Sequence, residues 1–217
     1  METLRSSIVE WGYASRALSG QPSSGDLMVV KSFPDGMLVA ALDGIGHGEE
    51  AASAAAAAGT ILEAHAREPV IALIERCHDG LRGTRGVALS LASFNASEGL
   101  MTWLGVGNVQ GVLLRGGLAT DAAEESLLLR AGVVGVQLPS LRADVLPAST
   151  GDTLIFATDG IRSDFNRGLA RNRPPQRAAD SILARHGKTT DDALVLVARY
   201  LWVAHESESG HSEGSDI

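Results

Sequence analysis

The sequence has few of the features that mark several common classes of protein. Cys77 is the only cysteine among 217 residues, which excludes an internal disulfide and a zinc site built from several cysteines. No apolar run approaches the roughly 18–20 residues that a membrane-spanning helix needs. The N-terminus lacks a basic region followed by an apolar stretch, so export is not expected. We therefore expect a cytoplasmic protein with no membrane partner.

Positive charge is also scarce. The chain has 18 Lys and Arg against 26 Asp and Glu, a net charge of −8. Such a balance does not favour binding to a nucleic-acid backbone, so we expect no nucleic-acid partner. Residues 205–217 are rich in Ser, Glu and Gly and have almost nothing to bury. The sequence therefore predicts a single domain over 1–204 and an acidic, disordered tail over 205–217.

Short apolar runs bounded by Gly, Pro and Asp dominate the predicted domain, and such runs are typical of strands. The expected strands are 27–32, 37–42, 87–94, 100–105, 109–115, 126–130, 153–158 and 193–200. The expected helices are 49–67, 70–82 and 175–186. Because most neighbouring strands read as hairpins, we predict an α+β fold, a layered α-β-β-α sandwich of two mostly antiparallel sheets flanked by helices.

Aspartates stand at the ends of these strands. Asp43 and Asp159 each follow an apolar run, Asp26 precedes one, and Asp191 and Asp192 precede another. The first hairpin has arms of similar length, so antiparallel pairing places Asp26 and Asp43 at the same end. If the strands next to Asp159 and Asp191 also run opposite to each other, all these carboxylates meet at one edge. Side chains alternate along a strand, so normally only one of Asp191 and Asp192 faces the cluster.

Crowded carboxylates repel one another unless a cation offsets them. All-oxygen ligand sets suit Mg²⁺ or Mn²⁺. Gly44 and Gly160 directly follow two of the aspartates, and the missing side chain lets backbone or bound water approach an ion. Any single aspartate at a strand end could simply form a turn. The coincidence of four such positions favours a divalent metal site.

Two glycine-rich segments allow other interpretations. The loop 43–48 leads into a helix and could cradle a phosphate, but it lacks the Gly-Lys-Ser/Thr ending of a nucleotide-binding loop. The segment 105–111 weakly imitates a dinucleotide-binding fingerprint, but its glycines are wrongly spaced and a strand follows. A bend or close packing inside a sheet is the better interpretation of the second segment.

Five motifs occur in an order that resembles the bacterial type-2C (PPM) metal-dependent protein serine/threonine phosphatases. They are Leu42-Asp43-Gly44-Ile45-Gly46-His47-Gly48, Thr84-Arg85-Gly86, Gly105-Val106-Gly107-Asn108, Ala157-Thr158-Asp159-Gly160 and Asp191-Asp192-Ala193. Within that family the chain is most similar to the SpoIIE/RsbX branch. The resemblance runs from about residue 25 to residue 200, and five ordered motifs are more specific than any one alone.

The resemblance implies a β-sandwich with two Mn²⁺ or Mg²⁺ ions at one edge. Asp43 would bridge both ions, and the Gly44 carbonyl would bind one of them. Asp159 and Asp191 would complete the second site, with Asp192 as the alternative to Asp191. The implied metal ligands are Asp26, Asp43, Gly44, Asp159, Asp191 and Asp192.

The sequence departs from eukaryotic relatives at two points. Those relatives place a histidine two residues after the bridging aspartate, where this chain has Ile45. His47 is close by, and it would serve either as an acid or substrate contact or as a residue that structures the loop. The arginine that clamps phosphate in eukaryotic enzymes has no secure counterpart. Arg16 is a candidate, whereas Arg85 is expected to brace the core or the end of a sheet.

The resemblance thus implies a protein serine/threonine phosphatase that acts by attack of a metal-bridged water, with Asp43, Asp159 and His47 as catalytic residues. Its implied substrate and partner is a phosphorylated STAS-domain regulatory protein, of the stressosome or anti-sigma-antagonist type. Two alternatives stay open. One is a weak or inactive phosphatase-like binding module, and the other is a hydrolase of small phosphate esters.

Overall fold

The structure is a computed structural model, and it describes residues 8–21, 23–116, 124–169 and 173–201. The predicted tail, 205–217, lies outside these residues, so the division into a domain over 1–204 and a tail stays a prediction. Within the described ranges, none of the helices combines the length and the apolar character needed to cross a membrane.

The strands and helices are as follows in chain order. The strands are β1 (Val9–Arg16), β2 (Asp26–Phe33), β3 (Gly36–Gly44), β4 (Val87–Asn95), β5 (Leu100–Val106), β6 (Gln110–Leu114), β7 (Glu124–Ser126), β8 (Leu129–Arg130), β9 (Asp144–Pro147), β10 (Thr153–Ala157) and β11 (Ala193–Tyr200). The helices are α1 (Glu49–Ala64), α2 (Val70–Gly80) and α3 (Pro175–His186).

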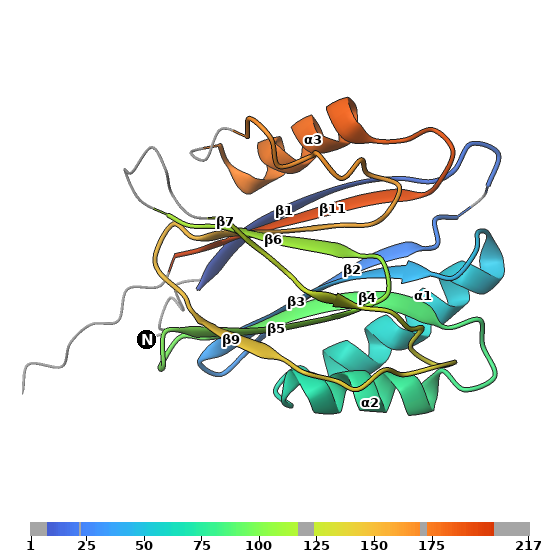
Figure 1. Cartoon of the computed structure of the whole chain (residues 1–217), viewed down its shortest axis with the longest axis horizontal. Coiled ribbons are helices and arrows are strands. Elements are labelled where there is room, and N and C mark those ends of the chain that lie inside the picture. Colours follow the sequence, from blue (N-terminus) through green and yellow to red (C-terminus); the bar gives the residue numbers. More distant parts are fainter. Residues whose placement is uncertain (1–7, 22, 117–123, 170–172, 202–217) are drawn as a thin grey trace, which may run out of the picture.

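The strands form two sheets that lie face to face. One sheet has the order β1-β11-β10-β6-β7, and the other has the order β2-β3-β4-β5-β8 with β9 also paired to β5. Apart from the parallel pair β5–β8, the strand pairs are antiparallel. In Figure 1, α3 covers the outer face of the first sheet, and α1 and α2 cover that of the second. The predicted α-β-β-α sandwich is confirmed.

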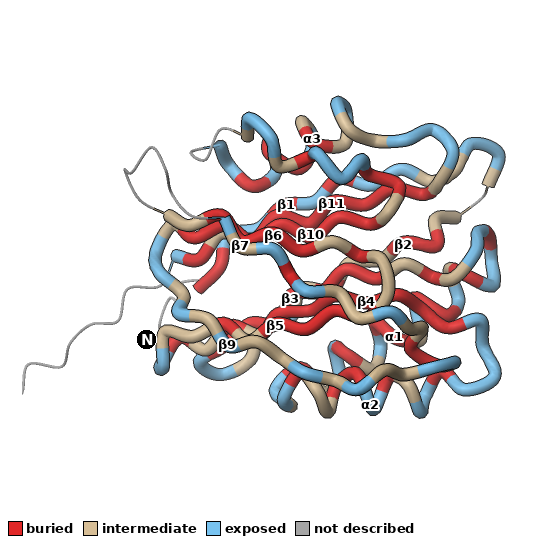
Figure 2. The backbone as a smooth tube through the Cα atoms, viewed as in Figure 1, coloured by how far each residue is buried: buried red, intermediate tan, exposed pale blue. Residues whose placement is uncertain are grey.

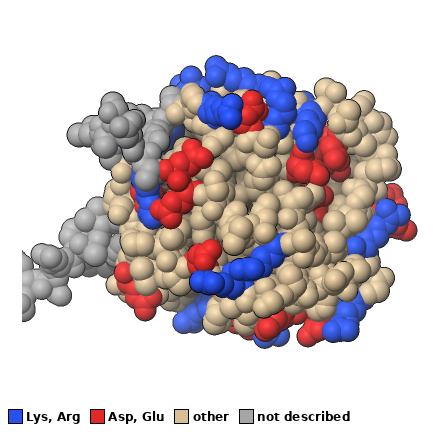
Figure 3. Space-filling model, viewed as in Figure 1, with Lys and Arg blue, Asp and Glu red and all other residues tan. Residues whose placement is uncertain are grey.

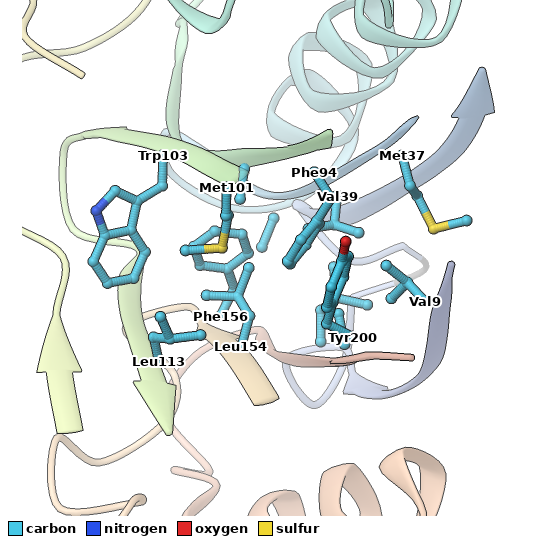
Figure 4. Close-up of a cluster of buried hydrophobic side chains, with 14 of the residues drawn as sticks. Val9, Met37, Val39, Phe94, Met101, Trp103, Leu113, Leu154, Phe156 and Tyr200 are labelled. Atoms are coloured by element: carbon cyan, nitrogen blue, oxygen red, sulfur yellow. The ribbon is translucent and has the colours of Figure 1, made fainter. Parts of the chain in front are cut away.

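Large apolar side chains from both sheets fill the space between them (Figure 4). Phe94 of β4 stacks on Tyr200 of β11, with ring centroids 5.6 Å apart, so this contact joins the sheets directly. Figure 2 shows the buried residues concentrated along the strands of both sheets. Outside the sandwich, α1 approaches its sheet closely because its buried face consists of Ala, Gly and one Leu. This packing holds the ends of the central strands in fixed positions.

Three parts of the fold differ from the sequence expectation, and one is β9, which pairs with β5 and was not among the expected strands. Strand β1 was not expected, because the residues that it packs under α3 are Gly12 and Ala14, while Trp11 and Tyr13 are about 40% exposed. An edge strand with small buried residues shows no apolar run. The expected strand 126–130 is instead two short strands in different sheets, β7 against β6 and β8 against β5. The chain crosses from one sheet to the other between them.

Candidate active site

The ends of four strands bring the predicted aspartates together. Asp26, at the start of β2, is paired in register with Asp43 near the end of β3. Asp159 lies two residues after β10, and Asp191 lies two residues before β11. Strands β10 and β11 are antiparallel, as the edge arrangement required. The carboxylates of the first sheet and those of the second therefore lie at the same end of the sandwich.

Two polar side chains connect these carboxylates across the gap between the sheets. The Asn108 side-chain amide donates to Asp43 Oδ2 at 3.2 Å and to Asp159 Oδ2 at 2.8 Å. The Thr158 hydroxyl donates to Asp26 Oδ2 at 2.8 Å and accepts a hydrogen bond from the backbone N–H of Leu194. Each sheet therefore contributes carboxylates to one hydrogen-bonded group.

Burial and mutual repulsion make these carboxylates unusually hard to ionise. Burial, with the Asp43 charge next, raises the pKa of Asp26 to about 8. Burial, with the Asp159 charge next, raises the pKa of Asp43 to about 7. The pKa of Asp191 is also raised, first by burial and then by Asp159. Such shifts mark a place where negative charge has been concentrated; the Lys188 charge lowers the pKa of Asp191 but does not cancel the rise.

Asp191 and Asp192 have different surroundings. Both side-chain oxygens of the buried Asp192 accept hydrogen bonds from backbone N–H groups, one from Leu18 at 2.7 Å and one from Gly25 at 2.8 Å. Asp191 is only partly buried, and its Oδ1 accepts a hydrogen bond from the Asp192 N–H. Asp192 thus ties the segment that leads into Asp26 to the site, whereas Asp191 retains an oxygen for another ligand.

The donor set fits a hard divalent cation, although a closed binding cage is not formed. In the part of the chain that the structure describes, no three His, Cys, Asp or Glu side chains are arranged so that they could hold an ion. Mg²⁺ usually keeps several waters and takes only one or two carboxylates, so a preformed cage is not required. The side-chain carbonyl oxygen of Asn108 is buried without a partner, which leaves one more acceptor at the site.

Glycines let the backbone pack closely around the site. A Cβ on Gly44 would lie 2.2 Å from the Ala51 carbonyl oxygen, and one on Gly160 would lie 1.7 Å from the Asp192 carbonyl oxygen. The position after each of these aspartates therefore requires glycine, because the neighbouring backbone leaves no room for a side chain. In the segment 105–111, Gly107 has a φ of 99° where the chain turns between β5 and β6. The predicted bend there is confirmed.

Basic residues line the rim of the site, but they do not neutralise it. Lys188 donates through Nζ to the Asp159 carbonyl oxygen at 2.5 Å, and Arg16 donates to the Lys188 carbonyl. Arg85 is exposed and pairs with Glu50 beside the loop at Gly46. Of the two expected roles of Arg85, bracing the core is wrong; the residue lies instead at the end of the β3–β4 pair, two residues before β4 and next to Gly46 after β3. A polar loop surface, rather than the apolar core, surrounds its guanidinium.

His47 lies exposed in the loop between β3 and α1, and no hydrogen bond connects it to another residue in the described ranges. Its two possible roles, as an acid or substrate contact and as a loop-structuring residue, both stay predictions. Asn108 and Thr158 belong to motifs noted in the sequence, but sequence reasoning gave them no function. Their role depends on which strand ends face each other across the sandwich, and local patterns do not contain that information.

Two features away from the carboxylates do not contribute to this site. Cys77 is fully buried, and burial raises the pKa of its thiol to about 12, so a reactive thiolate is not available. A hollow of about 400 Å³ lies between the β2–β3 turn and the end of α1. Its lining includes Lys31, Phe33 and His65 but none of the predicted site residues.

Comparison with known proteins agrees with this arrangement. Residues 34–201 match the family described as Stage II sporulation protein E (SpoIIE). Phosphoserine phosphatase RsbX of Bacillus subtilis (strain 168) is 32% identical over 183 residues, which cover 83% of this chain and 89% of RsbX.

Solved structures give the same result for the fold. A chain from a study of the bacterial stressosome, a modular system adapted to control secondary messenger signalling, has a TM-score of 0.78 and 28% identity. The match covers 88% of this chain and 99% of that one. RsbX crystallised with magnesium has a TM-score of 0.79 and 21% identity, with 90% of this chain and 96% of that one covered.

Proposed function

Because the chain belongs to the SpoIIE family of PP2C-type protein phosphatases, we propose that its carboxylate site holds two divalent ions, Mn²⁺ or Mg²⁺, and hydrolyses phosphoserine or phosphothreonine in a regulatory protein. One observation carries the proposal. Five aspartates gather at one end of the sandwich, and no Lys or Arg within the described ranges forms an ion pair with any of them. Divalent cations would supply the missing positive charge.

The residues divide into ligands and supports. Asp43, Asp159 and Asp191, with the Gly44 carbonyl, would hold the ions. Asp26 would act through water or a further ion. When bound, such ions supply a water of lowered pKa and positive charge opposite the phosphoryl oxygens.

The supporting residues keep the ligands in place before an ion arrives. Asn108 holds Asp43 and Asp159 at a fixed separation through its amide. Thr158 holds Asp26 in place through a hydrogen bond from its hydroxyl. Asp192 uses both oxygens on backbone N–H groups, so we assign it to anchoring the segment before β2 rather than to metal binding. This choice between Asp191 and Asp192 is part of the proposal.

The proposed substrate is a phosphorylated STAS-domain regulator of the stressosome or anti-sigma-antagonist type. Support comes from the similarity to RsbX, a phosphoserine phosphatase, and to a chain from a stressosome study. His47 as the acid for the leaving serine oxygen, and a cytoplasmic location, remain predictions.

The proposal is tested by Asp43→Asn, with hydrolysis of an aryl phosphate in the presence of Mn²⁺ as the measurement. We expect hydrolysis to be abolished, because Asp43 is the ligand that would hold both ions. Asp35→Asn is the matched control. It makes the same change at the other end of the same hairpin, where Asp35 has a φ of 59° that asparagine also adopts. Undiminished hydrolysis by a folded Asp43→Asn protein would refute the assignment.

Metal titration separates the enzyme from a binding module. Calorimetry should show Mn²⁺ binding that Asp43→Asn weakens. A wild-type protein that binds a phosphorylated regulator but shows neither Mn²⁺ binding nor turnover would instead be a phosphatase-like binding module. A protein that hydrolyses free small phosphate esters but no phosphopeptide would be a small-ester hydrolase.

A further inference from the structure

The segment 160–188, between Asp159 and the Asp191–Asp192 pair, has a charge opposite to that of the whole chain. It contains seven of the 18 Lys and Arg but only two of the 26 Asp and Glu. Its net charge is therefore +5 in a chain whose net charge is −8. A concentration of this size in a single short segment calls for a physical explanation.

Six of these basic side chains lie in described parts of the segment, and all six are exposed. They are Arg162, Arg167, Arg173, Arg177, Arg185 and Lys188, and we call them the basic surface. Figure 3 shows Lys and Arg gathered along the top of the molecule, where α3 lies in Figure 1. The helix buries Ala178, Ala179 and Ile182 against its sheet, so its charged residues face away from the sandwich.

Among the described arginines, a smaller share of those on the basic surface forms an ion pair than elsewhere, although Arg16, Arg67, Arg130 and Arg142 outside it form none either. Outside the segment, ion pairs are formed by Arg76, Arg82, Arg85, Arg115 and Arg199. Within the described part of the segment, Arg162 has a carboxylate partner, Asp164, at 3.8 Å, whereas Arg167, Arg177 and Arg185 have none. Unpaired arginines in a chain with excess carboxylates remain available for a negatively charged partner.

The basic surface is attached directly to the carboxylate site. The segment begins after Asp159 and ends before Asp191. Its two ends are joined by a bridge between Ile161 and Gly187 and by a hydrogen bond from the Lys188 N–H to the Gly160 carbonyl. Lys188 therefore lies beside the carboxylate site, where its Nζ donates to the Asp159 carbonyl oxygen. From there α3 extends over 12 residues, about 18 Å.

We propose that the basic surface docks an acidic stretch of the substrate protein next to its phosphorylated residue. This inference rests on the proposed phosphatase function. A short acidic segment of about six extended residues would span α3. A nucleic acid is a poorer fit, because the rest of the chain carries 24 acidic residues that would repel a long polyanion.

The test compares two phosphoserine peptides with Mn²⁺. One carries Asp and Glu on both sides of the phosphoserine, and its twin carries Asn and Gln at the same positions. The wild-type protein should have a higher kcat/KM on the acidic peptide, and this preference should shrink at high salt.

The double variant Arg177→Glu/Arg185→Glu should have a kcat/KM about tenfold lower on the acidic peptide, since two attractive contacts become repulsive. Arg177→Gln/Arg185→Gln should lose less, and aryl phosphate turnover should stay unchanged in both.

The matched control is Arg67→Glu/Arg142→Glu. It makes the same charge change at exposed arginines outside the segment, one beyond the end of α1 and the other in the loop before β9. This control should keep the preference for the acidic peptide. The docking inference is overturned if Arg67→Glu/Arg142→Glu lowers kcat/KM on the acidic peptide as much as Arg177→Glu/Arg185→Glu does. It is also overturned if the wild type hydrolyses both peptides equally well. Either result leaves the phosphatase function intact.

Two further outcomes would also count against the inference. If the wild type hydrolyses the aryl phosphate but neither peptide, the proposed function fails, and the docking inference fails with it. If Arg177→Glu/Arg185→Glu loses affinity for a non-specific DNA duplex but not activity on the acidic peptide, the surface serves a nucleic acid instead.

Discussion

Strand β10 has a carboxylate beyond each of its ends, and the two are stabilised in opposite ways. At its start, Asp152 is buried and accepts hydrogen bonds from the Arg115 guanidinium and from the backbone N–H groups of Gly116 and Ser149. Beyond its other end, Asp159 accepts from the Asn108 amide and lies among further aspartates. One carboxylate has its counter-charge built into the chain, and the other group lacks it.

The difference teaches how to separate a structural carboxylate from one that awaits a cation. Burial alone does not distinguish them, because Asp152 and Asp26 are both buried. The distinguishing feature is the partner. Arg115 pairs with Asp152 and also with Glu125, so the buried Asp152 has a cation in direct contact. At the other end, amide and hydroxyl donors hold the carboxylates in place but leave their charge unbalanced. Variants at the two ends should therefore change stability in opposite directions.

The largest effect is expected at the end of β10 where Arg115 pairs with Asp152. Arg115→Met removes the guanidinium and leaves Asp152 buried without its counter-charge, which should lower the free energy of unfolding by about 3 kcal/mol. Urea denaturation measures the loss. Aryl phosphate turnover with Mn²⁺ should stay close to wild type below the unfolding transition, because the site lies about 20 Å away along β10. A loss of turnover without a loss of stability would show that the two ends are coupled.

The next effect is the pH dependence of the metal-free protein. The pKa values of Asp26 and Asp43 are about 8 and about 7 in the folded state, against about 4 in an unfolded chain. Between pH 4 and 8 the folded protein therefore binds more protons than the unfolded chain, so its stability falls as the pH rises. With EDTA, the free energy of unfolding should drop by about 2 kcal/mol from pH 6 to pH 7. Added Mn²⁺ should reduce that drop, whereas a flat profile in EDTA would show that both carboxyls ionise normally.

The same substitution, Asp to Asn, should change the free energy of unfolding in opposite directions at the two ends of β10. In EDTA at pH 8, Asp159→Asn should stabilise the protein because it removes repulsion with Asp43 and Asp191. Asp152→Asn should destabilise it, because the Arg115 guanidinium loses its charged partner. We expect the two variants to differ by about 2 kcal/mol in urea denaturation. Equal destabilisation by both would mean that the site carboxylates are already balanced in the absence of metal.

Much of this site follows from the sequence by local rules. The equal arms of the first hairpin predict that Asp26 faces Asp43, and the register confirms it. The antiparallel arrangement of β10 and β11 was the condition for Asp159 and Asp191 to share that edge, and it holds. These predictions succeed because strand periodicity and turn length fix pairing within one sheet.

Contacts between the two sheets could not be predicted from the sequence. The bridge from Asn108 to both Asp43 and Asp159 depends on how two sheets pack, and no local pattern determines that. The two-part course of residues 126–130 depends on the same packing, since one part joins each sheet. Alternation predicts that only one of Asp191 and Asp192 faces the cluster, yet both raise the pKa of Asp43; what separates them is the N–H donors to Asp192, which come from a distant segment.

The smallest effect tests the amide that bridges the sheets. Asn108→Leu removes the donor to Asp43 and Asp159, so in EDTA at pH 8 the free energy of unfolding should fall by about 1 kcal/mol. At pH 6, where Asp43 is largely protonated, the loss should be smaller, since a neutral carboxyl needs the donor less. Asn108→Asp should destabilise the metal-free protein further but retain Mn²⁺ binding, because it adds both charge and a ligand oxygen. A loss for Asn108→Leu that is equal at both pH values would assign Asn108 to packing alone, and the carboxylates would then need no donor to stay at that separation.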